Sequence, residues 1–188
     1  MRSTISLGLL AVAAIAFVMA CGLGDQLAEA NKLVDEANVL ITESNAADTE
    51  ATPLLKELFS GILTSRDPAG YASKNKPKFD DLLAKLEKKA KTLADAGTKM
   101  TAASNMKLSD KFKEYLTLKS QQNVKNTENA NLVLDLVKTL VVTKDSKKVS
   151  SIVDDWKKKS DDNQTAAEDL GKKADQLIKD NPGLIKQN

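Results

Sequence analysis

Residues 25–41 read DQLAEANKLVDEANVLI, and the spacing of apolar side chains in this stretch decides the fold class. The apolar residues recur every three or four positions, at Leu27, Ala30, Leu33, Val34, Ala37, Leu40 and Ile41. This period places them on one face of an α-helix, with the polar side chains on the other face. Asp25 precedes the first apolar position and is a suitable N-cap. The stretch therefore predicts an amphipathic helix.

The same period recurs in three later segments. The period of the first helix weakens from Ser44 to Thr52, and Pro53, which suits a first turn or a kink, opens a second apolar run that ends at about Leu63. Three further helices are expected, from near Lys78 to 103–107, from Ser109 to near Lys144, and from Ser146 to 181–183. At ~1.5 Å per residue each is ~45–55 Å long, and the short links between the last three favour antiparallel neighbours. We expect an all-α protein, an elongated antiparallel up-down four-helix bundle formed by a single domain, residues 25–188.

The first two predicted helices carry opposite charge. Residues 22–60 contain eight acidic side chains and two lysines, whereas residues 74–99 contain eight lysines and four acidic side chains. We therefore expect these two helices to attract one another along their rims, modestly because exposed ion pairs are weak.

Composition excludes several classes of function. The chain has no histidine and one cysteine, so it lacks the usual ligands of zinc, copper and haem and the usual general base of serine and cysteine hydrolases. Its formal net charge of +2 provides no overall basic excess for nucleic acid. Adjacent carboxylates such as Asp80 and Asp81 diverge by ~100° on a helix, so they do not face one acceptor. We expect a non-catalytic protein with no metal, no cofactor and no nucleic-acid partner.

The first twenty residues have the pattern of a secretory signal. One basic residue precedes an apolar run of roughly 16 residues, too short for a permanent membrane span of ~20. The run ends at Val18-Met19-Ala20-Cys21, which resembles the lipobox of bacterial lipoproteins. The resemblance implies cleavage before Cys21, acyl chains such as palmitate on that cysteine and, with Gly22 next, sorting to the outer membrane. Ordinary secretory cleavage after Ala20 is the alternative.

The resemblance implies a chain in three parts: residues 1–20 as the signal peptide, 21–24 as a lipid tether and 25–188 as the helical domain. Cys21 is the only cysteine, so no internal disulfide competes for it. The tether reaches ~10 Å at most, which would hold the start of the first helix at the membrane. We expect a lipid-anchored protein of the bacterial cell envelope, acting as an interaction or structural module at a membrane surface.

Residues 61–77 collect proline, glycine and polar residues and have no apolar period beyond Leu63, so they predict a long loop. In the expected bundle this loop projects ~50 Å from the anchored end, with Arg66, Tyr71 and Lys74 exposed. We expect these three residues to contact an envelope protein partner. A flexible connector without a partner is the alternative.

The apolar stripes of the last two predicted helices are interrupted at one level. Polar residues stand at Gln122 and Asn126 in the third helix and at Ser160 and Asn163 in the fourth. A turn near Asp145 would bring the two interruptions together. Buried amides of this kind fix helix register or admit water. The alternative is a small polar cavity, which would make the protein a periplasmic carrier of a small ligand.

Overall fold

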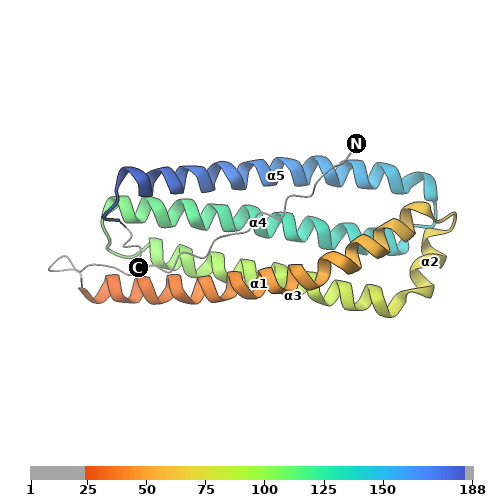
Figure 1. The fold of residues 1–188 in the computed structure, drawn as a ribbon, viewed down its shortest axis with the longest axis horizontal. Helices are drawn as coiled ribbons and strands as arrows, with labels where there is room; N and C mark the ends of the chain where they lie inside the picture. Colours follow the sequence, from red (N-terminus) through yellow and green to blue (C-terminus); the bar gives the residue numbers. More distant parts are fainter. Residues whose placement is uncertain (1–23, 185–188) are drawn as a thin grey trace.

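The computed structural model of this protein describes residues 24–184, and the lipobox with Cys21 lies outside this range. The described residues are all-helical, with five α-helices and no strand. The helices are α1 (Gly24–Thr64), α2 (Pro68–Lys74), α3 (Lys76–Ser104), α4 (Asp110–Val142) and α5 (Ser146–Asp180). The four long helices lie side by side along the longest axis of the molecule, and the short helix α2 lies at one end (Figure 1).

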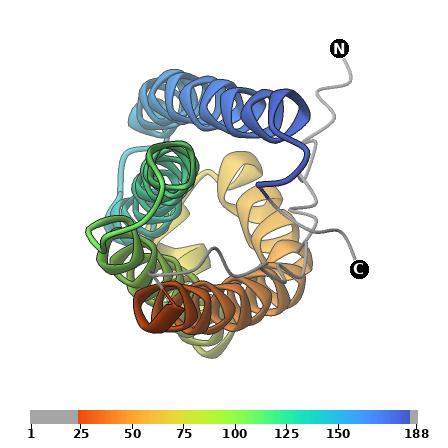
Figure 2. The same cartoon turned by 90° about the vertical axis from the view of Figure 1, so that its left-hand side faces the viewer.

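Each long helix packs mainly against its neighbour in the series α1, α3, α4, α5. Helix α1 and helix α5, the first and last of the series, touch only lightly. At the end opposite α2, the backbone N–H of Lys107 donates a 2.7 Å hydrogen bond to Oε1 of Gln26, which ties the start of α1 to the link between α3 and α4. Figure 2 views the helices from this end.

Ion pairs join α1 to α3 along most of their length, as the opposite charges of the two segments predicted. The Nζ atoms of three α3 lysines lie within 4 Å of α1 carboxylates, and Lys78 adds a fourth pair near the start of α3. The pairs are Glu36 with Lys99, Asp48 with Lys89, Glu50 with Lys85, and Glu57 with Lys78. Most of these side chains are at least one third exposed, so the pairs align the helices more than they stabilise them.

The hydrophobic core is divided into two large clusters. The cluster at the end where α1 begins includes Val34, Ile41, Met100, Phe112, Leu116 and Leu177. The cluster at the α2 end includes Leu58, Ile62, Leu82, Leu86, Leu140 and Val149. Between them the core contains a small group formed by Ala90, Leu93 and Ala130. The middle of the molecule therefore buries smaller apolar side chains than either end, which leaves it the smallest share of hydrophobic stabilisation.

Helix α1 changes direction in its second half (Figure 1), the part of the helix that contains Pro53. Proline has no N–H for the carbonyl four residues earlier, and its ring crowds that carbonyl, so a bend is expected here. Beyond the bend α1 approaches α5, and the rings of Phe59 and Trp156 lie 6.4 Å apart between centroids. This aromatic contact lies in the α2-end cluster, on the seam between the first and last helices.

The prediction of a long loop over residues 61–77 is wrong. Helix α1 runs to Thr64, and α2 and α3 occupy most of the remaining residues. Pro68 is the first residue of α2, a position that needs no N–H donor, and Oδ1 of Asp67 caps the helix by accepting a 3.0 Å bond from the N–H of Gly70. The proline and glycine that suggested a loop therefore serve to begin a helix.

Candidate functional site

The predicted polar layer has two residues on α4, Gln122 and Asn126, and two on α5, Ser160 and Asn163, and contacts between the two helices involve Gln122 and Ser160. Oγ of Ser160 donates a 2.7 Å hydrogen bond to Oδ1 of Asn129. The amide of Gln122 lies against Gly171, where an added Cβ would stand only 2.7 Å from Nε2. A larger residue at this point of α5 would displace the end of the flexible Gln122 side chain. These two contacts set the register of α5 on α4.

Two hydrogen-bond donors in this region are buried without a partner. They are Nδ2 of Asn126 and Nε1 of Trp156, one on each of the two helices. Asn163 is partly buried, and no hydrogen bond joins it to Asn126. A buried donor without an acceptor costs free energy. A water molecule or another acceptor bound next to either group would remove this cost.

Lys119 is a partly buried charged residue of α4, one turn before Asn123. Its Nζ donates a 2.7 Å hydrogen bond to Oε1 of Gln122. Burial lowers the pKa of Lys119, while the carboxylate of Asp175 on α5 acts in the opposite direction. Burial, with a smaller contribution from Asp175, raises the pKa of nearby Tyr115 to about 12. Both groups thus sit in a less polar environment than the surface, and neither lines the surface groove between α3 and α4 described below.

A second set of buried polar residues lies on α3 or packs against it, and it was not predicted as a site. Its members are Ser44, Thr92, Ser120 and Asn123. Oγ of Ser44 donates to the carbonyl of Lys89 at 3.5 Å, and the hydroxyls of Thr101 and Ser120 are 2.7 Å apart. The signal for Ser44 was present in the sequence, because it continues the three-and-four spacing of the α1 stripe toward Ala47 and Ala51. Because the residues in this part of the stripe are small, the apolar period was predicted to weaken here.

The structure has a surface groove between α3 and α4 with a volume of about 550 Å³. Its lining includes Ala94, Gly97, Thr98 and Ala102 from α3, and Val124 and Thr127 from α4. None of the four residues of the predicted polar layer lines this groove. This groove therefore does not coincide with the polar layer.

The three residues expected to bind a partner are not brought together as one exposed group. Arg66 lies in the link between α1 and α2, Lys74 is the last residue of α2, and both are exposed. Tyr71 is partly buried in the α2-end cluster, with its ring edge-on to Phe79 at 6.5 Å between centroids. Tyr71 therefore supports the packing of α2, and only Arg66 and Lys74 face solvent.

Residues 24–184 contain no group of three or more Cys, Asp or Glu side chains placed to hold a metal ion. None of the helices described for this chain is long and apolar enough to cross a membrane. Comparison with known protein families, curated protein sequences and solved structures gives no match. The function is therefore inferred from the residues of the chain itself.

Proposed function

We propose that this chain is a lipid-anchored protein of a bacterial cell envelope, whose mature part is a non-catalytic antiparallel up-down four-helix bundle. In this proposal the bundle is an interaction or structural module held at a membrane surface, on the outer membrane. Its contact surface for another envelope component is the end that carries α2, with Arg66 and Lys74. The observation that carries the proposal is the sequence Val18-Met19-Ala20-Cys21, with its single cysteine at the cleavage boundary.

The start of α1 supports the anchored geometry. Helix α1 begins at Gly24, only three residues after Cys21, so the acylated cysteine and the helix can be separated by no more than ~10 Å. Three acyl chains provide stable anchoring, where a single chain would be marginal. The order of contacts α1, α3, α4, α5 supports the up-down arrangement, because each pair of sequential long helices is joined by a short connection or by α2.

Intact mass and membrane fractionation test this proposal. We expect the protein extracted from membranes to have the mass of residues 21–188 plus acyl chains. The variant Cys21→Ala should lose the acyl mass and the membrane association, because no other cysteine can accept the lipid. The control Val39→Ala changes an exposed side chain and should remain acylated and membrane-bound. An unmodified, water-soluble wild-type chain would contradict the proposal.

A second candidate function is a periplasmic small-ligand carrier. The observation that favours it is the pair of buried, unpartnered donors, Nδ2 of Asn126 and Nε1 of Trp156, on facing helices. A ligand with an oxygen acceptor would satisfy them, as would water. No residue of the polar layer lines the α3–α4 groove, so we rank this candidate second.

Replacing Asn126 distinguishes the two functions. We expect Asn126→Leu to raise the free energy of unfolding by about 1 kcal/mol, because leucine removes a donor that has no partner. The matched variant Asn129→Leu should lower it by about 1 kcal/mol, because it leaves the hydroxyl of Ser160 unpaired. Urea unfolding measures both changes. A small molecule that copurifies with the wild-type protein in native mass spectrometry, and is lost in Asn126→Leu, would favour the carrier instead.

A further inference from the structure

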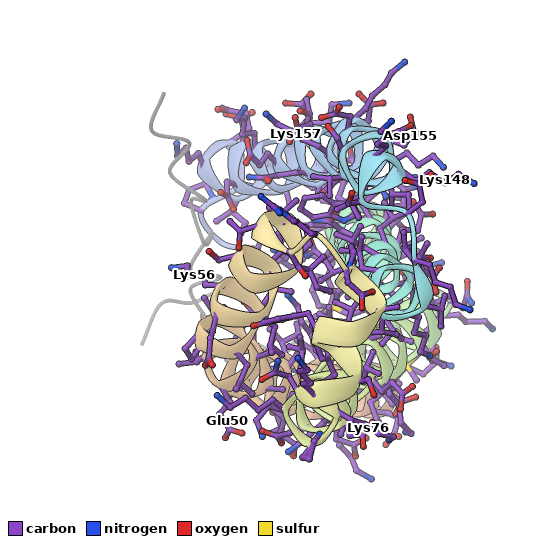
Figure 3. All side chains as sticks on the ribbon, turned by 90° about the vertical axis from the view of Figure 1, so that its right-hand side faces the viewer. Glu50, Lys56, Lys76, Lys148, Asp155 and Lys157 are labelled. Carbon is purple, nitrogen blue, oxygen red and sulfur yellow. The ribbon has the colours of Figure 1, made fainter. Side chains whose placement is uncertain are left out.

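The end of the molecule that carries α2 has five exposed cationic side chains without a carboxylate partner. They are Arg66, Lys74, Lys144, Lys147 and Lys148, and no carboxylate within residues 24–184 lies within 4 Å of their charged nitrogens. Ala72 of α2, Leu140 of α4 and Val149 of α5 share one buried cluster, so the segments that carry these cations meet at this end. Figure 3 views the molecule from this side and labels Lys148 near the start of α5.

Four acidic side chains near these cations are engaged elsewhere, whereas Asp154 and Asp155, further along α5, are exposed and form no ion pair; Figure 3 labels Asp155 at this end. Asp67 and Asp145 accept hydrogen bonds from backbone N–H groups as the caps of α2 and α5. Asp80 pairs with Lys76, and Glu57 pairs with Lys78. These acids lower the net charge, but none of them forms an ion pair with any of the five cations. Residues 64–75 and 143–148, which form the tip of this end, contain five cations and two acids, so the positive field is confined to the tip.

Stability does not explain two of these lysines. Lys147 and Lys148 lie in the first turn of α5, which contains no acidic residue. The positive end of the helix dipole disfavours cations there. A role that requires positive charge at this place accounts for them better than folding does.

Exposed apolar side chains accompany the cations. Val142, the last residue of α4, is 71% exposed, and Leu63, next to the last residue of α1, is 49% exposed. Cations around exposed aliphatic groups are the combination that binds the interface of an anionic bilayer, where the charges meet headgroups and the apolar groups enter the boundary layer.

We propose that this basic end docks onto an anionic lipid bilayer. Four of the five cations are lysines, which act as point charges without the planar fork by which arginine selects one carboxylate or phosphate. They come from separate links and helices, and none lines the α3–α4 groove, so they suit a flat surface of many charges better than a single acidic peptide. The inference deepens the proposed function, since the anchor at the opposite end would make this bilayer a second one.

A vesicle-docking experiment tests the proposal. The full-length protein, purified from membranes, is reconstituted into dense neutral phosphatidylcholine vesicles. These are mixed with fluorescent vesicles that contain about 30 mol% phosphatidylglycerol, and the fluorescence that sediments with the dense vesicles is measured. We expect docking to anionic vesicles at ~0.1 M salt, at least about tenfold less docking to neutral ones, and loss of docking at ~1 M salt.

Two triple variants with the same change in charge locate the surface. Lys144→Glu/Lys147→Glu/Lys148→Glu should reduce docking at least about tenfold, whereas Lys157→Glu/Lys158→Glu/Lys159→Glu, on exposed positions further along α5, should retain most of it. Misfolding is not expected in the first variant, because Lys144 lies in an exposed link and glutamate at 147 and 148, in the first turn of α5, favours the helix. Equal docking to neutral vesicles, or equal loss in both variants, would overturn the proposal.

The proposal and the lipid anchor fail in distinguishable ways. If the intact mass shows no acyl chains, the soluble chain is sedimented directly with anionic vesicles, and the same two variants are compared. Binding in that assay retains the docking surface while discarding the anchor. Binding to poly-L-glutamate without binding to anionic vesicles would overturn the lipid proposal and indicate an acidic protein partner instead.

Discussion

Replacing Phe112 by alanine is expected to lower the free energy of unfolding by about 3–5 kcal/mol. Phe112 is 2% exposed and lies in the cluster at the end where α1 begins, which collects side chains from all four long helices. Its ring stacks on Tyr115 at 6.3 Å between centroids. Removing it leaves a cavity where the four helices meet, and helix backbones joined by short links can close such a cavity only in part.

Urea or thermal unfolding followed by circular dichroism measures this effect. Val39→Ala is the matched control, because Val39 is 59% exposed on α1 and its truncation should change stability by about 0.5 kcal/mol or less. A loss below ~1 kcal/mol for Phe112→Ala would show that the cluster around Phe112 does not hold the helices together. It would also remove the physical basis for a rigid bundle next to the proposed anchor.

The long helices could be predicted from the sequence because each has to bury one face. Apolar residues at every third or fourth position over 29 to 41 residues fit few structures other than an amphipathic helix. The lysines of α3 and the acidic residues of α1 independently indicated that these two helices are neighbours. The residues after α1 could not be predicted in the same way. Helix α2 has only seven residues, too few for a periodic pattern, and its start depends on a hydrogen bond from Gly70 to Asp67.

The candidate sites could be predicted only in part. The positions of Asn126 and Ser160 on facing stripes follow from counting residues about a turn, but their hydrogen bonds do not. Ser160 bonds to Asn129, a residue outside the predicted layer, because side-chain rotamers rather than helical period decide the pairing. The exposed cations at the α2 end were visible as single residues, but the links that bring them together lie between helices, where sequence period carries no information.

Gly61→Ala is expected to lower the free energy of unfolding by about 1–3 kcal/mol, although alanine is the better helix former by ~1 kcal/mol. A Cβ on Gly61 would stand 2.6 Å from Cε2 of Tyr71 and closer still to Cζ and Oη. The ring of Tyr71 would have to leave α1, and with it the edge-on contact to Phe79. Urea unfolding measures the loss, and proteolysis at the α1–α2 link reports whether α2 has detached.

The sign of this effect should depend on Tyr71. In the background Tyr71→Ala the ring is gone, so Gly61→Ala should instead raise the free energy of unfolding by about 0.5–1 kcal/mol, through its helix propensity and the smaller entropy of the unfolded chain. The double-mutant cycle measures this reversal as a coupling energy between the two residues. The same change in both backgrounds would mean that Tyr71 does not lie on Gly61, and that α2 is held against α1 by other contacts.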